Sequence, residues 1–324
     1  MALLLIVVSS GWMSAREAAP IFVLDDPRGD DHGNGKLIYP MRDDLHPGDL
    51  DLISFSARPE GEGTLFEAVF ARKIAPTDRR TIDVGGGSLD TVCRFNFYTL
   101  NIDIYVDKDG VDGSGEVMTL PGRLAEIDSA NAWEKVICLT PRPFEAAEAL
   151  QRIMKANAKR QMKAMYGSID DAKLDLATAR LAAEMPSKYF FPTRINVIGP
   201  IIRFFVPAMF LGGQAEASWS YVVAVSGADY EQELDVGGIL HITEGAAPRL
   251  MIIPIAYGTW ADRFGGAGED DYLLPPLVDV IVPEGKKQEA VLNDYDLRSG
   301  RPVRLPGVIP AGRGAASQTK PASR

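Results

Sequence analysis

The feature that most constrains this chain is an acidic run, interrupted by glycine and proline, near its start. It reads Asp25-Asp26-Pro-Arg-Gly-Asp30-Asp31-His-Gly-Asn-Gly35. Glycine carries a large ordering cost in regular structure and proline donates no backbone hydrogen bond, so the run should form a loop. Such a loop can fold its oxygens around a hard cation, since Ca²⁺ takes about six to eight oxygen ligands from flexible segments. A solvated acidic turn is the alternative that the same residue types favour.

The expected ligands of this cation come from the acidic run and from a segment that follows it, His46-Pro-Gly-Asp49-Leu-Asp51-Leu52. The full expected set is Asp26, Asp30, Asp31, Asp49 and Asp51. Ca²⁺ is therefore the expected cofactor, because carboxylates on a flexible loop are its usual ligands.

A second, weaker cation site is expected at Asp107, Asp109 and Asp112, in the run Asp107-Lys-Asp-Gly-Val-Asp-Gly-Ser-Gly115. The run lacks the glutamate and the flanking helices of an EF-hand loop. An Asp/Gly turn between strands is the competing interpretation.

Alternation of apolar and polar residues predicts β-strands along most of the chain. The expected strands are 52–57, 64–71, 94–106, 136–139, two buried strands within 195–210, 219–225, 250–257 and 277–282. From Phe144 to Met185 the apolar period becomes helical and is interrupted at Gly167. This predicts an antiparallel helical hairpin, inserted over about residues 143–192, in a mainly β protein. The hairpin either only packs on the β-structure or docks a protein partner through residues 144–185.

Bulk properties limit the partners and the compartment. The 324 residues carry a formal net charge of −10, which argues against nucleic acid as a ligand. Residues 1–19 combine an apolar run with small residues, as a secretory signal peptide does. We therefore expect a secreted, periplasmic or cell-surface protein, with the folded module at 20–310 and a disordered tail at 311–324. Prolines interrupt the apolar residues 195–210, so a membrane span is not expected.

Three further questions stay open at this level. Cys93 and Cys138 are either paired or buried free thiols. His32, His46 and His241 are the histidines that could bind a haem iron. Carboxylates are plentiful enough for a glycosidase, but no nucleophile-elbow serine, zinc-binding histidine pair or Cys–His pattern occurs, so we expect no catalytic residues.

Aromatic residues are the expected contacts for a sugar. Trp260 and Tyr272 flank the Gly/Asp-rich loop 262–271, and Tyr257 precedes it. An aromatic ring presents an apolar face beside polar groups, as a sugar platform needs. Burial in the core is the alternative for aromatic residues in strands.

Several motifs together resemble one known family. In chain order they are Asp26-Pro-x-Gly-Asp-Asp31-x-Gly-x-Gly35, Tyr39-Pro40, Pro47-Gly-Asp-Leu-Asp-Leu52, Ile102-Asp-Ile-Tyr-Val-Asp107-x-Asp-Gly110, Gly113-Ser-Gly115, Leu120-Pro-Gly-Arg123, Ala132-Trp-Glu134, Trp219-Ser-Tyr-Val-Val223, Val278-Asp-Val-Ile-Val-Pro-Glu-Gly285, Gln288-Glu289 and Asp294-Tyr-Asp296. They resemble the C-terminal module of bacterial glucodextranases and of related cell-surface amylases and pullulanases.

The resemblance implies an antiparallel β-sandwich of the immunoglobulin-like or jelly-roll type, similar to DOMON and family 9 carbohydrate-binding modules. It also implies non-catalytic attachment to a polysaccharide or to a glycan of the cell envelope. Members of the family usually accompany a catalytic domain, and the helical hairpin interrupts the expected strand order. A surface adaptor, a periplasmic binding protein or an assembly subunit are therefore alternative roles.

Overall fold

The computed structural model describes residues 18–79, 83–84, 87–167, 170–231 and 248–310. Nearly all of the expected signal peptide, all of the expected tail and His241 lie outside these residues.

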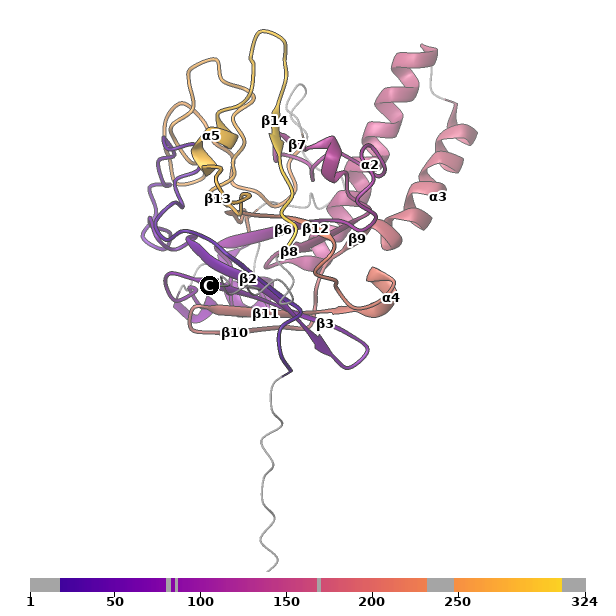
Figure 1. The fold of residues 1–324 in the computed structure, drawn as a ribbon. Helices are drawn as coiled ribbons and strands as arrows, with labels where there is room; N and C mark the ends of the chain where they lie inside the picture. The colour runs from indigo at the N-terminus through magenta and orange to yellow at the C-terminus, as the bar shows by residue number, and fades with distance from the viewer. Residues whose placement is uncertain (1–17, 80–82, 85–86, 168–169, 232–247, 311–324) are drawn as a thin grey trace, which may run out of the picture.

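Two five-stranded sheets stack to form a β-sandwich, as predicted (Figure 1). The first sheet has the order β1 (Phe22–Asp25), β2 (Leu52–Glu60), β3 (Gly63–Phe70), β11 (Ile201–Pro207) and β10 (Ile195–Ile198). The second has the order β13 (Asp279–Val280), β12 (Ser220–Gly227), β6 (Leu100–Asp107), β8 (Lys135–Leu139) and β9 (Tyr189–Phe190). All neighbours within the two sheets are antiparallel except β8 and β9.

The main core lies between the sheets, because alternate residues of each strand point inward. On β6 these are Leu100, Ile102, Ile104 and Val106, and the inward row of β12 is Tyr221, Val223 and Val225. The first sheet contributes the opposing residues Phe55, Phe66, Phe70, Ile202, Phe204 and Val206. Phe66 stacks between Phe55 and Phe204, with ring centroids 5.5 and 5.6 Å away.

The outer face of the second sheet is also covered, so β6 and β12 are buried along their whole length. A second core joins this face to helix α2 (Pro143–Tyr166), to the short parallel pair of β7 (Ala125–Ile127) with β14 (Val303–Leu305), and to α5 (Gln288–Leu292). Because the second sheet is buried on both faces, neither of its broad faces is available to a ligand.

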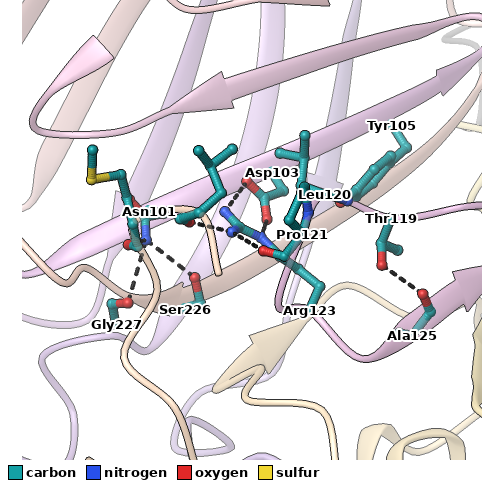
Figure 2. Close-up of polar contacts among 12 residues, drawn as sticks. Asn101, Asp103, Tyr105, Thr119, Leu120, Pro121, Arg123, Ala125, Ser226 and Gly227 are labelled. Atoms are coloured by element: carbon teal, nitrogen blue, oxygen red, sulfur yellow. Dashed lines mark hydrogen bonds and ion pairs between the residues drawn. The ribbon is translucent and has the colours of Figure 1, made fainter. Parts of the chain in front are cut away.

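Polar side chains nevertheless follow the outer face of β6, and each makes hydrogen bonds, although Asn101 Oδ1 is buried without a partner among the described residues (Figure 2). Asn101 donates to the carbonyls of Met251 and Gly227, at 2.7 and 3.3 Å. Asp103 pairs with the fully buried Arg123 in two contacts of 2.6 and 3.1 Å. The hydroxyl of Tyr105 accepts a hydrogen bond from the backbone of Leu120 at 2.9 Å. This row fastens the segments 118–127 and 249–252 onto the sheet.

The predicted helical hairpin is present and consists of α2 and α3 (Asp171–Lys188), which project from one side of the sandwich (Figure 1). Gly167 ends α2 at a φ of 69°, which favours glycine, and the Asp170 side chain accepts the backbone N–H of Lys173 to cap α3. The first half of α2 is anchored through Ala146, Ala149, Leu150 and Ile153.

The remaining elements are short. They are β4 (Asp83–Val84), β5 (Gly87–Ser88), α1 (Leu89–Val92), α4 (Ala208–Leu211) and the 3₁₀ turns η1 (Thr77–Arg79) and η2 (Ser129–Asn131). Within the described parts of the chain, no helix has the length and apolar character needed to cross a membrane.

Four expected strands differ from the structure. Of the two buried strands expected within 195–210, β10 lies at the edge of its sheet and is partly exposed. The strand expected at 250–257 is wrong: this segment makes only isolated bridges, including Ala228 with Ile252 and Ile255 with Phe264. Pro254 and the positive φ of Met251, 50°, interrupt regular pairing. The strand expected at 94–106 begins only at Leu100, and that at 277–282 is reduced to the two residues of β13.

Cys93 and Cys138 are both buried free thiols. Burial raises the pKa of Cys93 to about 12, and it also raises the pKa of Cys138 well above its usual value. Both thiols are therefore protonated and unreactive at neutral pH.

Candidate functional site: an acidic cluster beside an aromatic loop

The acidic run forms the loop between β1 and β2, and its carboxylates gather at the edge of the sandwich. Oxygens of Asp26, Asp30 and Asp279 all lie within 4.8 Å of one another. Asp279 belongs to β13 of the second sheet, so the cluster joins the two sheets. Asp279 is fully buried and Asp51 is 3% exposed.

Each of these carboxylates has one buried oxygen that has no hydrogen-bond partner among the described residues. The buried oxygens without partners are Asp26 Oδ2, Asp30 Oδ1, Asp51 Oδ1 and Asp279 Oδ1. The second oxygen of Asp279 accepts the backbone N–H of Leu52 at 2.7 Å, and that of Asp51 accepts from Gly29 at 2.9 Å. These backbone bonds fix the carboxylates while leaving one oxygen of each available for another ligand.

The cluster is electrostatically unfavourable when it holds only protein atoms. Burial, together with the charges of Asp30 and Asp51, raises the pKa of Asp26 to about 7. Burial raises the pKa of Asp30 to about 6, and burial with the charges of Asp26 and Asp30 raises the pKa of Asp279 well above its usual value. A cation in the cluster would remove this penalty, since it favours the charged carboxylates.

Two of the expected ligands have other partners. Asp31 accepts hydrogen bonds from the Tyr39 hydroxyl and from the Gly48 backbone inside the loop. Asp49 accepts from the His46 backbone at 2.8 Å and lies 3.6 Å from an Arg72 nitrogen. Of the five expected ligands, Asp26 and Asp30 therefore belong to the group within 4.8 Å, and the charge of Asp51 acts on both of them.

Asp279 was not among the expected ligands, although the sequence contains a signal for it. It is the one charged residue in the apolar run Leu277-Val-Asp-Val-Ile-Val282. A charge in a buried strand needs a partner, and such a residue is a candidate ligand for that reason.

Helix α5 holds the acidic loop in place from the other side. Gln288 is buried and its amide donates to the carbonyls of Asp30 and Gly33, at 2.7 and 3.1 Å, while its oxygen accepts from Val280 at 2.6 Å. His32 lies 3.1 Å from the Glu289 carboxylate. This network links the loop to β13 and leaves His32 engaged with a carboxylate.

The second acidic group differs from its expected composition. Oxygens of Asp107, Asp109 and Glu134 lie within 4.8 Å of one another, whereas Asp112 is not part of this group. Glu134 accepts the backbone N–H of Lys108 at 2.7 Å, and its other oxygen is buried without a partner. Asp109 accepts from Val111 and Ser114, which is the bonding of an Asp/Gly turn.

The three aromatic residues expected to bind sugar are exposed: Tyr257 by 70%, Trp260 by 63% and Tyr272 by 60%. Trp133 and Trp219, in contrast, are buried. Tyr272 lies apart along the chain and donates to the Leu297 carbonyl at 3.0 Å.

Tyr257 and Trp260 belong to one loop, residues 256–265, which we call the aromatic loop. It is held by the segment 38–41: Met41 donates to the Trp260 carbonyl at 3.0 Å, and Thr259 donates to the Tyr39 carbonyl at 2.8 Å. Gly265 and Ile38 exchange two backbone hydrogen bonds of 2.8 and 3.0 Å. The aromatic loop is therefore supported by the same chain segment that continues from the acidic loop.

Comparison with known proteins agrees with the sequence motifs. A family model described as the C-terminal binding-module, SLH-like, of glucodextranase matches residues 21–307. This range includes both sheets, the acidic cluster and the aromatic loop. No curated protein matches the chain.

Proposed function

Because the chain belongs to the family of C-terminal, SLH-like binding modules of glucodextranase, we propose that it is an exported, non-catalytic module that binds a polysaccharide or a cell-envelope glycan. The observation that carries the proposal is the match of this binding-module family over residues 21–307. The family is described as a binding module and not as a catalytic domain, which supports a non-catalytic role.

The aromatic loop is the proposed contact surface for the glycan. An indole or phenol ring offers an apolar face that can stack against the C–H groups of a sugar ring. Exposure of Tyr257 and Trp260 leaves those faces free, while backbone hydrogen bonds on both sides of Trp260 hold the loop in one conformation. A preformed loop loses less conformational entropy when a ligand binds.

Calcium and an extracytoplasmic location are part of the same proposal. The acidic cluster offers oxygen ligands of the kind that Ca²⁺ prefers. Export agrees with the apolar start of the chain, and with a ligand that is a polysaccharide or an envelope glycan.

Affinity electrophoresis tests the proposal directly. The full chain is run through gels containing soluble starch, dextran, pullulan or purified cell-wall polysaccharide, and at least one should retard it. Trp260→Ala should abolish most of the retardation, whereas Met209→Ala, which removes another highly exposed apolar side chain, should leave it unchanged. Equal mobility in every gel would contradict the proposed function.

One observation supports a second candidate function, the docking of a protein partner. The outer part of the helical hairpin carries exposed apolar side chains, with Met165 at 73% and Tyr166 at 64% exposure. Exposed apolar groups of this kind are common at protein interfaces. Co-purification of a partner that is lost in Met165→Ser/Tyr166→Ser would favour this role.

A further inference from the structure

The acidic cluster places several carboxylates together without a lysine or arginine, in the part of the chain that the structure describes, in direct contact with them. Among the described residues, no lysine or arginine forms an ion pair with Asp26, Asp30, Asp51 or Asp279. A buried charge without a partner of opposite charge is costly, and this cluster contains several such carboxylates. The fold brings Asp279 into the cluster from a segment more than two hundred residues away in the chain.

The orphaned oxygens show where a compensating group would sit. Asp279 is fully buried, and its Oδ1 has no hydrogen-bond partner among the described residues unless a proton is shared with Asp26. The same is true of one oxygen each on Asp26 and Asp30. Buried acceptors almost always have a partner, so three of them around one point indicate a ligand that can satisfy all three.

The chemistry of these oxygens favours Ca²⁺. Oxygens held within 4.8 Å of one another can share one Ca²⁺, since each Ca²⁺–oxygen bond is about 2.3–2.6 Å long. Mg²⁺ demands near-ideal octahedral geometry and usually keeps several waters, which a buried cage of protein carboxylates does not suit. The three carboxylate oxygens lie within 4.8 Å of one another, and no histidine or cysteine belongs to the group that the described residues form. Oxygen ligands alone disfavour zinc, which prefers nitrogen and sulfur.

The acidic cluster is connected to the aromatic loop by a short chain of contacts. Asp31, next to Asp30, accepts a hydrogen bond from the Tyr39 hydroxyl. The Tyr39 carbonyl accepts from Thr259 at 2.8 Å, and the Tyr39 ring packs edge-on against Phe264 with centroids 5.4 Å apart. A change in the position of Asp30 and Asp31 would therefore shift Tyr39, which is hydrogen-bonded to the aromatic loop that carries Trp260.

We propose that Asp26, Asp30 and Asp279 bind one Ca²⁺ ion, with Asp51 beside it, and that the bound ion holds the aromatic loop in its glycan-binding conformation. The first part concerns a ligand set that joins the two sheets. The second part, that glycan binding depends on calcium, rests on the proposed function.

Calcium titration of the full chain tests the ligand set. After removal of metal with chelator, isothermal titration with calcium chloride should give a stoichiometry that falls by one site in Asp279→Asn, or an affinity for that site at least tenfold weaker. The matched control is Asp49→Asn, which removes a carboxylate of the same loop that pairs with Arg72, and it should titrate like the unmodified protein. Absence of calcium binding, or unchanged binding by Asp279→Asn, overturns the ligand set.

A second variant guards against a folding defect. Asp26→Asn removes a half-buried member of the cluster, and circular dichroism decides whether each variant is folded before it is titrated. If Asp279→Asn does not fold, Asp26→Asn must show the loss of the site; a folded Asp26→Asn that binds calcium normally overturns the proposal.

Affinity electrophoresis with calcium or with EGTA in the gel tests the link to the aromatic loop. Retardation of the unmodified protein should fall at least fivefold in EGTA, and Asp279→Asn should be weak in both gels. Trp260→Ala should lose retardation yet keep calcium binding. Equal retardation with and without calcium overturns the link. A protein that binds calcium but is retarded by no glycan in either gel contradicts the proposed function and leaves the ligand set standing on the titration alone.

Discussion

Replacing Arg123 by methionine should be among the most destabilising substitutions at a single site in this protein. The Arg123 and Asp103 side chains are each 1% exposed, and they meet through two contacts of 2.6 and 3.1 Å (Figure 2). Arg123 also donates to the carbonyls of Pro121 and Leu250. Methionine fills a similar volume but leaves the Asp103 carboxylate without its positive partner.

The magnitude follows from that burial. Removing one partner of a buried ion pair costs about 3–5 kcal/mol, because the remaining charge stays desolvated. A loss of this size should lower the melting midpoint by roughly 6–10 °C, taking about 2 °C per kcal/mol for a chain of this size. Replacing both residues, in Asp103→Leu/Arg123→Met, should restore part of the loss, since neither charge is then buried alone.

Chemical denaturation of the single and double variants measures these free energies. The control is Arg304→Met: Arg304 lies 3.7 Å from Glu126 but is 58% exposed, so its loss should cost less than about 1 kcal/mol. An Arg123→Met protein within about 1 kcal/mol of the unmodified one would refute the reasoning, because it would mean that water reaches Asp103.

Three further predictions concern the second core, the aromatic loop and the cation. Leu150→Ala should cost about 2–5 kcal/mol in a urea melt, because Leu150 is buried under the sheet, whereas Met165→Ala on the exposed end of the same helix should cost little. Gly266→Ala should destabilise by about 1–3 kcal/mol and weaken retardation by glycans, since its φ is 104° and a Cβ would lie 2.0 Å from the Lys36 carbonyl; Gly258→Ala, with open space around it, should stay within about 0.5 kcal/mol. Chelation should lower the melting midpoint by roughly 5 °C relative to protein in calcium at a hundredfold excess over Kd, since a ligand at that level adds about 2.7 kcal/mol; an unchanged midpoint would argue against the ion.

Local sequence patterns were sufficient for the fold class and for the helical insertion. The alternation of side chains along 102–106 and 219–225 predicts which residues of β6 and β12 face the core, because a strand puts alternate side chains on opposite faces. The helical hairpin follows from its own periodicity and from Gly167, which ends α2 in a left-handed conformation. Both signals depend on residues that are near neighbours in the chain.

Strand limits were less predictable, because pairing depends on distant partners. Residues 250–257 alternate well enough to suggest a strand, yet they lie over the second sheet and pair only at isolated points. There they receive hydrogen bonds from Asn101 and Arg123, which occupy the carbonyls of Met251 and Leu250. The side chains of Asn101 on β6 and of Arg123 thus help to set the conformation of residues 250–257.

The sequence by itself determined that an acidic, glycine-rich loop would follow the first strand, since no regular element accommodates those residues. Only the tertiary structure decided which carboxylates meet: it brings Asp279 to Asp26 and Asp30, and it turns Asp49 toward Arg72. At the second acidic group it replaces Asp112 with Glu134. The physical reason is that carboxylates come together through the pairing of strands, and a strand's neighbours are set by the packing of the whole sandwich and not by spacing along the chain.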